Sequence, residues 1–238
     1  MKKEIIDYNP FDVRIPDSQY SNLLKEIMTR GKRFVPIHAR LPENAHLEHK
    51  ESKDITGYEL KYDLSNGFPL QTIRNFEKGF YGSMGEICAF LNGEHTLEGL
   101  AKFGTPDLFW APSITKERNA VFGLEEGDLG PGSYGSVLRN MPGPDGKSFD
   151  QVLALENMIK KMPYSRTLTL TSWYPPYAVG DKQQGQPRKV NVAPCHGTFT
   201  RIKIYDQENE LHIHTTQRSA DTAVGLMGNI TQWCALGM

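Results

Sequence analysis

One cysteine stands where the sequence could supply a nucleophile. Cys195 lies between a proline and a histidine, just before a run in which polar and apolar side chains alternate. A second alternating run follows a polar, turn-prone segment at residues 206–210. Two such runs joined by a short polar segment predict an antiparallel β-hairpin. Cys195 is therefore expected at the entrance to the first strand of a hairpin.

The predicted hairpin brings a positive charge to this cysteine. If Tyr205 pairs near Leu211, antiparallel pairing places Cys195 opposite residues 220–221, give or take a few residues of register. Arg218 then lies close to the sulfur. An adjacent guanidinium favours the thiolate over the thiol, and a thiolate is a strong nucleophile. The alternative is that the cysteine is a small apolar filler of the core, which is common for this residue type.

Composition places limits on the partners of the chain. It has 238 residues, a formal net charge of -1 and both signs mixed along its length, so we expect one domain and no nucleic-acid partner. Its three cysteines are too few and too scattered for a disulfide framework. No stretch has the length of a membrane span, and the N-terminus has no apolar signal region. We therefore expect no membrane partner and a cytoplasmic location.

Apolar periodicity predicts the helices that surround the hairpin. Helical spacing of apolar residues is found at residues 18–30, 76–91 and 148–162. In the second helix, Cys88 is expected on the buried face. In the third, Ser148 is expected to cap the first turn together with Gln151, and Met162 is expected to point inward.

The remaining segments are predicted to be strands, turns and loops. Strands are expected at residues 57–64 and 168–173, and loops at residues 34–54 and 174–189. A glycine-rich segment at residues 127–135 either lets the backbone approach a ligand or only makes turns.

Two histidine pairs are candidate metal ligands. They are His46 with His49 and His212 with His214. Neither pair has the cysteine or carboxylate neighbours of a defined zinc spacing. We therefore expect no metal site.

Several segments, in the right order along the chain, resemble motifs of thymidylate synthases. The segment APCH at residues 193–196 resembles the nucleophile motif of that family, and QRSAD at residues 217–221 is similar to its QRS-x-D motif. GLMGNI at residues 225–230 resembles GLPFNI, and GEICAFLNG at residues 85–93 resembles HELLWFLQG. The other matching segments are GFPL at residues 67–70, DLGPGSYG at residues 128–135 and SR at residues 165–166.

The resemblance implies a fold and an assembly. It implies an α+β fold, in which a large mixed β-sheet is covered by helices on one face, and a homodimer in which two sheets pack together. It also implies a single domain over residues 1–238 that lacks the C-terminal segment of the family. That segment would carry a His-x-Tyr pair and a tail that closes over folate.

The resemblance also implies a reaction. A one-carbon unit from the co-substrate 5,10-methylenetetrahydrofolate is transferred to C5 of dUMP, giving dTMP and dihydrofolate without a metal. Cys195 would add to C6 of the uracil ring, and Arg218 would activate the thiolate and bind the phosphate. Asn229 would read the O4 and N3–H edge of the base. Glu86 and Tyr134 would manage proton transfers.

Binding roles follow from the same resemblance. Asp221 is implied to hold the folate pterin and to take part in catalysis, and Arg166 to reach the phosphate in the neighbouring subunit. The complete substrate set is Arg218, Ser219, Gln217, Asn229, Arg166 and His196. The folate set is Asp221, Gly225 and Trp110.

The chain departs from the family pattern at positions that bear on its activity. Thr167 replaces the second arginine of the family's SRR motif, and Arg40 is a weak candidate for an N-terminal phosphate arginine. Ala89 replaces a tryptophan, a change that would admit water. Water capture of the methylene intermediate would make the protein a pyrimidine nucleotide hydroxymethylase. The third alternative is an inactive nucleotide-binding homologue.

Overall fold

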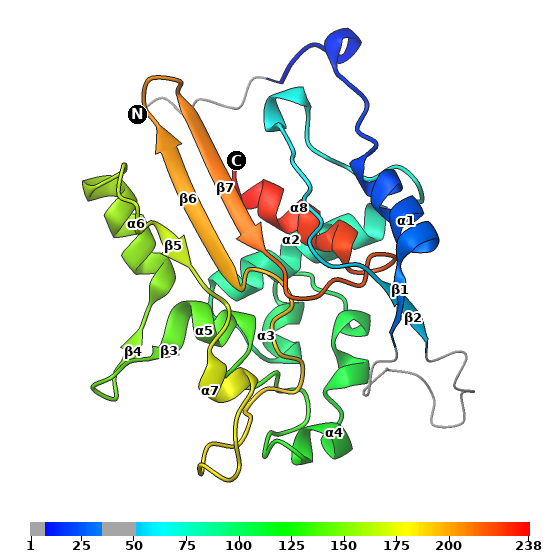
Figure 1. The fold of residues 1–238 in the computed structure, drawn as a ribbon. Coiled ribbons are helices and arrows are strands. Elements are labelled where there is room, and N and C mark those ends of the chain that lie inside the picture. The colour runs from blue at the N-terminus through cyan, green and yellow to red at the C-terminus, as the bar shows by residue number, and fades with distance from the viewer. Residues whose placement is uncertain (1–7, 35–50) are drawn as a thin grey trace. The chain divides into compact units, whose positions relative to one another are not determined.

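The computed structural model describes residues 8–34 and 51–238 (Figure 1). The chain divides into two units, Met1–Arg74 and Asn75–Met238. Arg40, His46 and His49 lie outside the described residues, so the predictions that concern them stay predictions. No helix of the described residues combines the length and the apolar character that crossing a bilayer requires.

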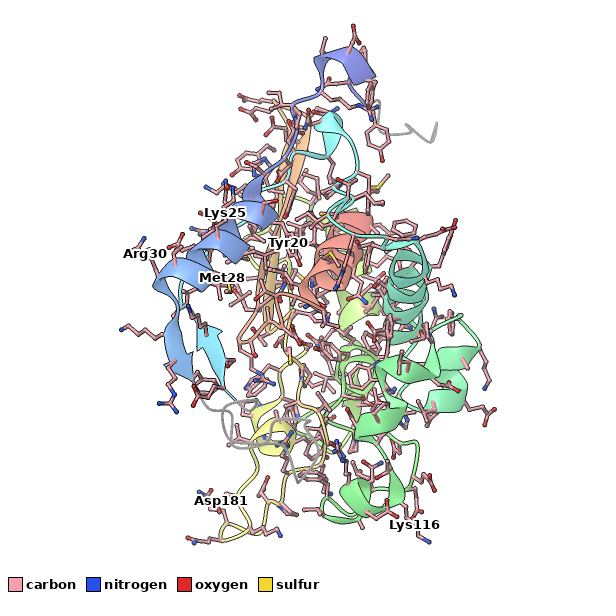
Figure 2. All side chains as sticks on the ribbon, turned by 90° about the vertical axis from the view of Figure 1, so that its right-hand side faces the viewer. Tyr20, Lys25, Met28, Arg30, Lys116 and Asp181 are labelled. Carbon is pink, nitrogen blue, oxygen red and sulfur yellow. The ribbon has the colours of Figure 1, made fainter. Side chains whose placement is uncertain are left out.

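The first unit is built around one helix. Helix α1 (Gln19–Arg30) confirms the prediction and ends at Gly31, after which β1 (Lys32–Phe34) pairs antiparallel with β2 (Ser52–Asp54). Tyr20 and Arg30 leave opposite sides of α1 (Figure 2), and Tyr20 is buried while the Arg30 side chain is exposed. The described part of this unit also contains two 3-10 helices, η1 (Phe11–Val13) and η3 (Leu64–Asn66).

The strand expected at residues 57–64 is wrong. Residues 55–63 form neither helix nor strand. The side chain of Gln19 explains part of this, because it takes both backbone hydrogen bonds of Lys61. Gln19 Nε2 donates to Lys61 O at 2.5 Å, and Lys61 N donates to Gln19 Oε1 at 2.8 Å. A side-chain amide thus stands where a neighbouring strand would pair.

The second unit contains the predicted hairpin. Strand β6 (Phe199–Tyr205) pairs antiparallel with β7 (Glu210–Thr216), and the short β5 (Thr169–Leu170) pairs antiparallel with the other edge of β6 (Figure 1). Tyr205 pairs with Glu210, one residue from the expected register. Thr200 and Ile202 point into the core, as the alternation predicts.

Helices pack against one another and against this hairpin. Helix α2 (Glu77–Leu91) contacts both α8 (Leu226–Leu236) and α5 (Tyr134–Asn140), and α5 contacts α6 (Gln151–Lys161). Phe90 from α2, Leu138 from α5, Leu155 from α6 and Ile202 from β6 belong to one buried cluster. This core fixes α2, α5 and the start of β6 relative to each other.

Shorter elements connect these helices. They are α3 (Leu97–Ala101), η4 (Asp107–Phe109), η5 (Ala111–Ser113), α4 (Lys116–Ala120), β3 (Met141–Pro142), β4 (Ser148–Phe149) and α7 (Pro175–Ala178). Figure 2 shows Lys116 on α4 and Asp181 in the loop that follows α7.

Three details of the predicted helices are wrong. Cys88 is exposed, because the buried side of α2 is lined by small residues such as Ser83 and Ala89 that a hydrophobic pattern underweights. Asp150, not Ser148, caps α6 by accepting from Leu153 N at 2.9 Å. Met162 is exposed because the helix has already ended at the preceding residue.

The large mixed sheet implied by the resemblance is not confirmed. Among the described residues the largest sheet has three strands, and its pairings are antiparallel. The mixture of helices and small sheets is compatible with an α+β fold.

Candidate functional site

The sulfur of Cys195 lies beside a guanidinium, as the hairpin register predicts. Arg218 Nη2 is 3.5 Å from Cys195 Sγ, and Arg218 N donates to Cys195 O at 2.9 Å. Sγ also lies 3.6 Å from Ala193 O, to which the thiol form donates. Cys195 is half-buried. The sulfur is therefore neither enclosed in the hydrocarbon core nor far from positive charge.

The Arg218 guanidinium is held in place by the segment that leads to the cysteine. Its Nε donates to Pro194 O and its Nη2 donates to Ala193 O, both at 2.8 Å. It also lies over the ring of Trp173, 5.2 Å from the centroid. These contacts fix the fork of the guanidinium while Arg218 itself stays exposed.

Tyr134 connects α5 to the cysteine. Its hydroxyl oxygen accepts from Cys195 N at 2.6 Å and from His196 N at 3.4 Å. The ring stacks on Phe90 with a centroid separation of 4.7 Å. Burial raises the pKa of Tyr134 above its ordinary value, and the neighbouring Cys195 charge adds to this effect. The phenol therefore stays protonated and keeps its O–H as a donor.

His196 is a buried, neutral histidine. Burial lowers its pKa to about 3. Trp233 Nε1 donates to His196 Nδ1 at 3.0 Å, which makes Nδ1 the acceptor and leaves the proton on Nε2. Gly197 permits this contact, because it has a φ of 63° and any Cβ there would overlap the Trp233 ring.

Glu86 lies on the buried side of α2 with both carboxylate oxygens occupied. Trp110 Nε1 donates to Oε1 at 2.5 Å, and Gln232 Nε2 donates to Oε2 at 2.6 Å. Burial raises the pKa of Glu86, and the two hydrogen bonds partly oppose this rise. A raised pKa and a fixed orientation are what a group that exchanges protons at neutral pH requires.

The start of α8 brings three further predicted residues together. Asn229 Nδ2 donates to Gln217 Oε1 at 3.1 Å, which leaves the Asn229 amide oxygen for another partner. Asp221 Oδ1 accepts from Ala223 N at 3.2 Å and Val224 N at 3.1 Å, so Asp221 shapes the turn before the helix.

Other predicted residues lie at the edge of this arrangement. Ser219 is exposed next to Arg218, and Gly225 is the N-cap of α8. Arg166 is exposed before β5, and no hydrogen bond or ion pair joins it to Cys195 or Arg218. Trp110, which the resemblance places in the folate site, donates its indole N–H to Glu86.

A comparison with models of protein families shows the family to which the chain belongs. The model of the family described as Thymidylate synthase matches residues 18–238. The chain belongs to the thymidylate synthase family. Members of this family bind dUMP and use methylenetetrahydrofolate as co-substrate. The match covers the segments that carry Glu86, Tyr134, Cys195, Arg218 and Asn229.

Two residues of this thymidylate synthase family site were missed by sequence reasoning. Gln232 and Trp233 both come from α8 and bind Glu86 and His196, respectively. Their position could have been predicted in part from Asn229, which lies on the same helix. Residues three and four positions after Asn229 lie on the same helix face. Within the residues described, no group of three or more His, Cys, Asp or Glu side chains is arranged to hold a metal ion.

Proposed function

We propose that this chain transfers a one-carbon unit from 5,10-methylenetetrahydrofolate to C5 of dUMP, giving dTMP and dihydrofolate. The observation that carries the proposal is the 3.5 Å approach of Arg218 Nη2 to the half-buried Cys195 Sγ. Arg218 thus places a positively charged hydrogen-bond donor beside the sulfur, and a thiolate sulfur is the nucleophilic form of cysteine.

Cys195 starts the reaction by adding its sulfur to C6 of the uracil ring. The new S–C6 bond moves the ring electrons toward C5 and O4, so C5 becomes the nucleophilic carbon. Covalent addition divides a difficult substitution into easier steps. Tyr134 supports this step by holding the backbone N–H of Cys195, which fixes the direction of the side chain.

The surrounding polar groups would bind the uracil base and transfer protons to and from it. The amide oxygen of Asn229, which has no hydrogen-bond partner among the residues described, accepts N3–H of uracil, while Gln217 holds the amide in orientation. Glu86 exchanges protons with O4 and C5 through water, because burial raises its pKa and so favours the protonated form more than in an exposed carboxylate. Tyr134 and neutral His196 supply donors in the same region.

The residues present fit a folate co-substrate at the turn before α8. Asp221 is exposed, and its Oδ1 accepts from the backbone whereas Oδ2 has no hydrogen-bond partner among the residues described. That oxygen can accept an N–H of a pterin, with Gly225 close by at the helix end. Bound methylenetetrahydrofolate supplies the one-carbon unit and the reducing equivalents for the methyl group.

We also propose that the protein works as a homodimer in the cytoplasm. Arg166 supports this proposal, because it is exposed and has no partner in its own site. In a homodimer it would contribute to the phosphate site of the second subunit.

The hydroxymethylase alternative loses one of its arguments. It relied on Ala89 to admit water, but Ala89 is fully buried in the core cluster with Phe90 and Trp110. The inactive-homologue alternative is disfavoured, because Cys195, Arg218, Glu86 and Asn229 all keep a geometry that serves chemistry.

The three alternatives give different products in one assay. The purified chain is mixed with dUMP and methylenetetrahydrofolate, and we expect the absorbance rise of dihydrofolate together with dTMP. A Cys195→Ser variant is expected to show neither. A hydroxymethylated nucleotide with tetrahydrofolate retained would replace the proposal by the hydroxymethylase. Absence of both products, with no covalent adduct to a 5-fluorinated dUMP, would indicate the inactive homologue.

A further inference from the structure

Two arginine side chains are attached to the segment that leads to Cys195. Arg188 Nη2 donates to Asn191 O at 2.6 Å, and Arg218 Nη2 donates to Ala193 O at 2.8 Å. The two accepting carbonyls are only two residues apart in the chain. Arg188 and Arg218 are therefore neighbours in space, although they come from different loops.

Neither guanidinium is paired with a carboxylate of the described residues. In the described part of the chain, no Asp or Glu forms an ion pair with Arg188 or Arg218. Burial, together with the positive charge of Arg218, lowers the pKa of Arg188 from its ordinary value, and the two charges repel each other. Two adjacent, uncompensated guanidiniums are stabilised when an anion lies between them.

The Arg188 side chain is ordered by contacts that leave it open to a ligand. Its guanidinium lies over the Phe122 ring, 5.0 Å from the centroid. Its Nε is buried and has no hydrogen-bond partner among the residues described, which is costly for a donor unless a ligand compensates it. Arg188 also lines a surface cavity together with Lys182 and Gly180.

We infer that Arg188 is a phosphate-binding residue, and that Arg188 and Arg218 together bind the 5′-phosphate of the nucleotide whose base reacts with Cys195. The inference rests on the proposed function for the identity of the nucleotide. A phosphate monoester offers three oxygens, which suits two planar guanidinium forks that approach from different loops. Arg218 would then serve both the sulfur and the phosphate, and Arg188 the phosphate alone.

The test is a binding measurement that does not depend on turnover. Dissociation constants for dUMP, deoxyuridine and inorganic phosphate are measured by calorimetry with the wild-type chain and with Arg188→Gln. We expect Arg188→Gln to weaken dUMP binding about ten- to hundredfold, the effect of losing charged hydrogen bonds, and to weaken inorganic phosphate as well. Binding of deoxyuridine, which has no phosphate, should stay within about twofold.

A matched control is available at the next position. Lys189 is an exposed cation whose ammonium lies 5.6 Å from the Tyr177 ring centroid. Lys189→Gln removes the same charge one residue away and should leave all three affinities unchanged. Arg188→Lys keeps the charge but not the planar fork, so it should recover only part of the loss.

Each other outcome contradicts the inference. Unchanged dUMP affinity in Arg188→Gln would remove Arg188 from the phosphate site while leaving the proposed reaction intact. An equal loss of dUMP and deoxyuridine would indicate a structural defect. If the wild-type chain shows no reaction, inorganic phosphate binding still tests the inference. Loss of phosphate binding in Arg188→Gln would support it. A wild-type chain that binds neither dUMP nor phosphate would overturn it.

Discussion

Glu86 is a carboxylate enclosed in the protein with a hydrogen-bond donor on each oxygen. Burial raises its pKa, and the hydrogen bonds from Trp110 and Gln232 lower it, because they stabilise the charged form. Gln232→Leu removes one of these two opposing contributions. The pKa of Glu86 should therefore rise further, and the acid limb of the pH–rate profile should move to higher pH.

The measurement is the pH dependence of the proposed reaction, with the Glu86 carboxyl followed in parallel by infrared difference spectroscopy. Gln184→Leu is the matched control, because Gln184 is exposed and donates to Asp181 in its own loop. An acid limb that stays in place in Gln232→Leu would mean that Gln232 does not tune Glu86.

The raised pKa of Glu86 also predicts how the free energy of unfolding depends on pH. Its pKa in the folded chain is raised above the unfolded value, so folding favours the protonated form. Its contribution to stability is therefore present at acid pH and is lost as pH rises through the folded pKa. Glu86→Gln, which cannot ionise, should be more stable than wild type at pH 8 by more than it is at pH 4, as measured by urea unfolding. A stability difference that does not change with pH would contradict the assigned direction.

Trp233 makes a prediction about His196. The indole N–H is the donor that His196 Nδ1 accepts in a buried site. Trp233→Phe leaves that nitrogen unpaired and should reduce the free energy of unfolding by about 1–3 kcal/mol in addition to any packing loss. Urea unfolding measures the loss, and nitrogen-15 chemical shifts of His196 report whether the proton leaves Nε2. Retention of the same tautomer in Trp233→Phe would show that Trp233 does not select it.

At the residue level, the sequence predicted contacts between residues whose proximity follows from a local pattern. Cys195 and Arg218 could be placed together because hairpin register is a local rule, and the structure differs by only one residue. Glu86 could be found only through its motif, since helical periodicity does not mark a buried carboxylate. Gln232 could not be assigned to Glu86, because that contact joins two helices far apart in the sequence.

Packing between helices α2 and α8 depends on a close approach at one glycine. A Cβ on Gly228 would come within 2.6 Å of Ser83 Oγ on α2. Gly228→Ala should therefore destabilise the chain by about 1–3 kcal/mol, the usual cost of overpacking. Because α2 carries Glu86 and α8 carries Asn229, the same change should also reduce activity.

Two variants test whether this effect is local. Gly225→Ala lies at the N-cap of the same helix, where a Cβ would meet Asp221 O at 3.7 Å, so its cost in packing should be small. Ser83→Ala removes the clashing oxygen, so the double variant Ser83→Ala, Gly228→Ala should recover much of the stability. Equal losses in the single and double variants would place the cause elsewhere. Thermal and urea unfolding give the comparison.

At the level of elements, periodicity identified helices and the hairpin but not their capping or their neighbours. Asp150 rather than Ser148 caps α6, because the Asp150 carboxylate accepts from Leu153 N whereas Ser148 is paired with Pro142 in the β3–β4 ladder. The segment at residues 57–64 alternates like a strand but pairs with a side chain of α1. Such choices depend on tertiary neighbours, which one sequence does not display.

At the level of the whole molecule, the family relationship was predicted from the resemblance of motifs and not from the periodicity of apolar residues. The family match at residues 18–238 runs through both units, although contacts divide the chain after Arg74. The family could be recognised because its motifs lie in chain order. The size of the sheet and the assembly could not be derived, because strand pairing between distant segments and contacts between subunits have no local pattern.

The proposed homodimer makes a prediction that needs two different subunits. If Arg166 serves the partner's site, Arg166→Ala and Cys195→Ala each impair both sites of their own homodimers. A heterodimer of the two has one site with an intact Cys195 and an Arg166 from the other subunit. Equal co-expression should therefore restore up to about a quarter of the wild-type sites, since half of the dimers are mixed. Activity and native mass spectrometry are measured together, with Cys195→Ala and Cys195→Ser as the non-complementing pair. Mixed dimers without recovered activity would assign Arg166 to its own subunit, and a purely monomeric species would contradict the dimer.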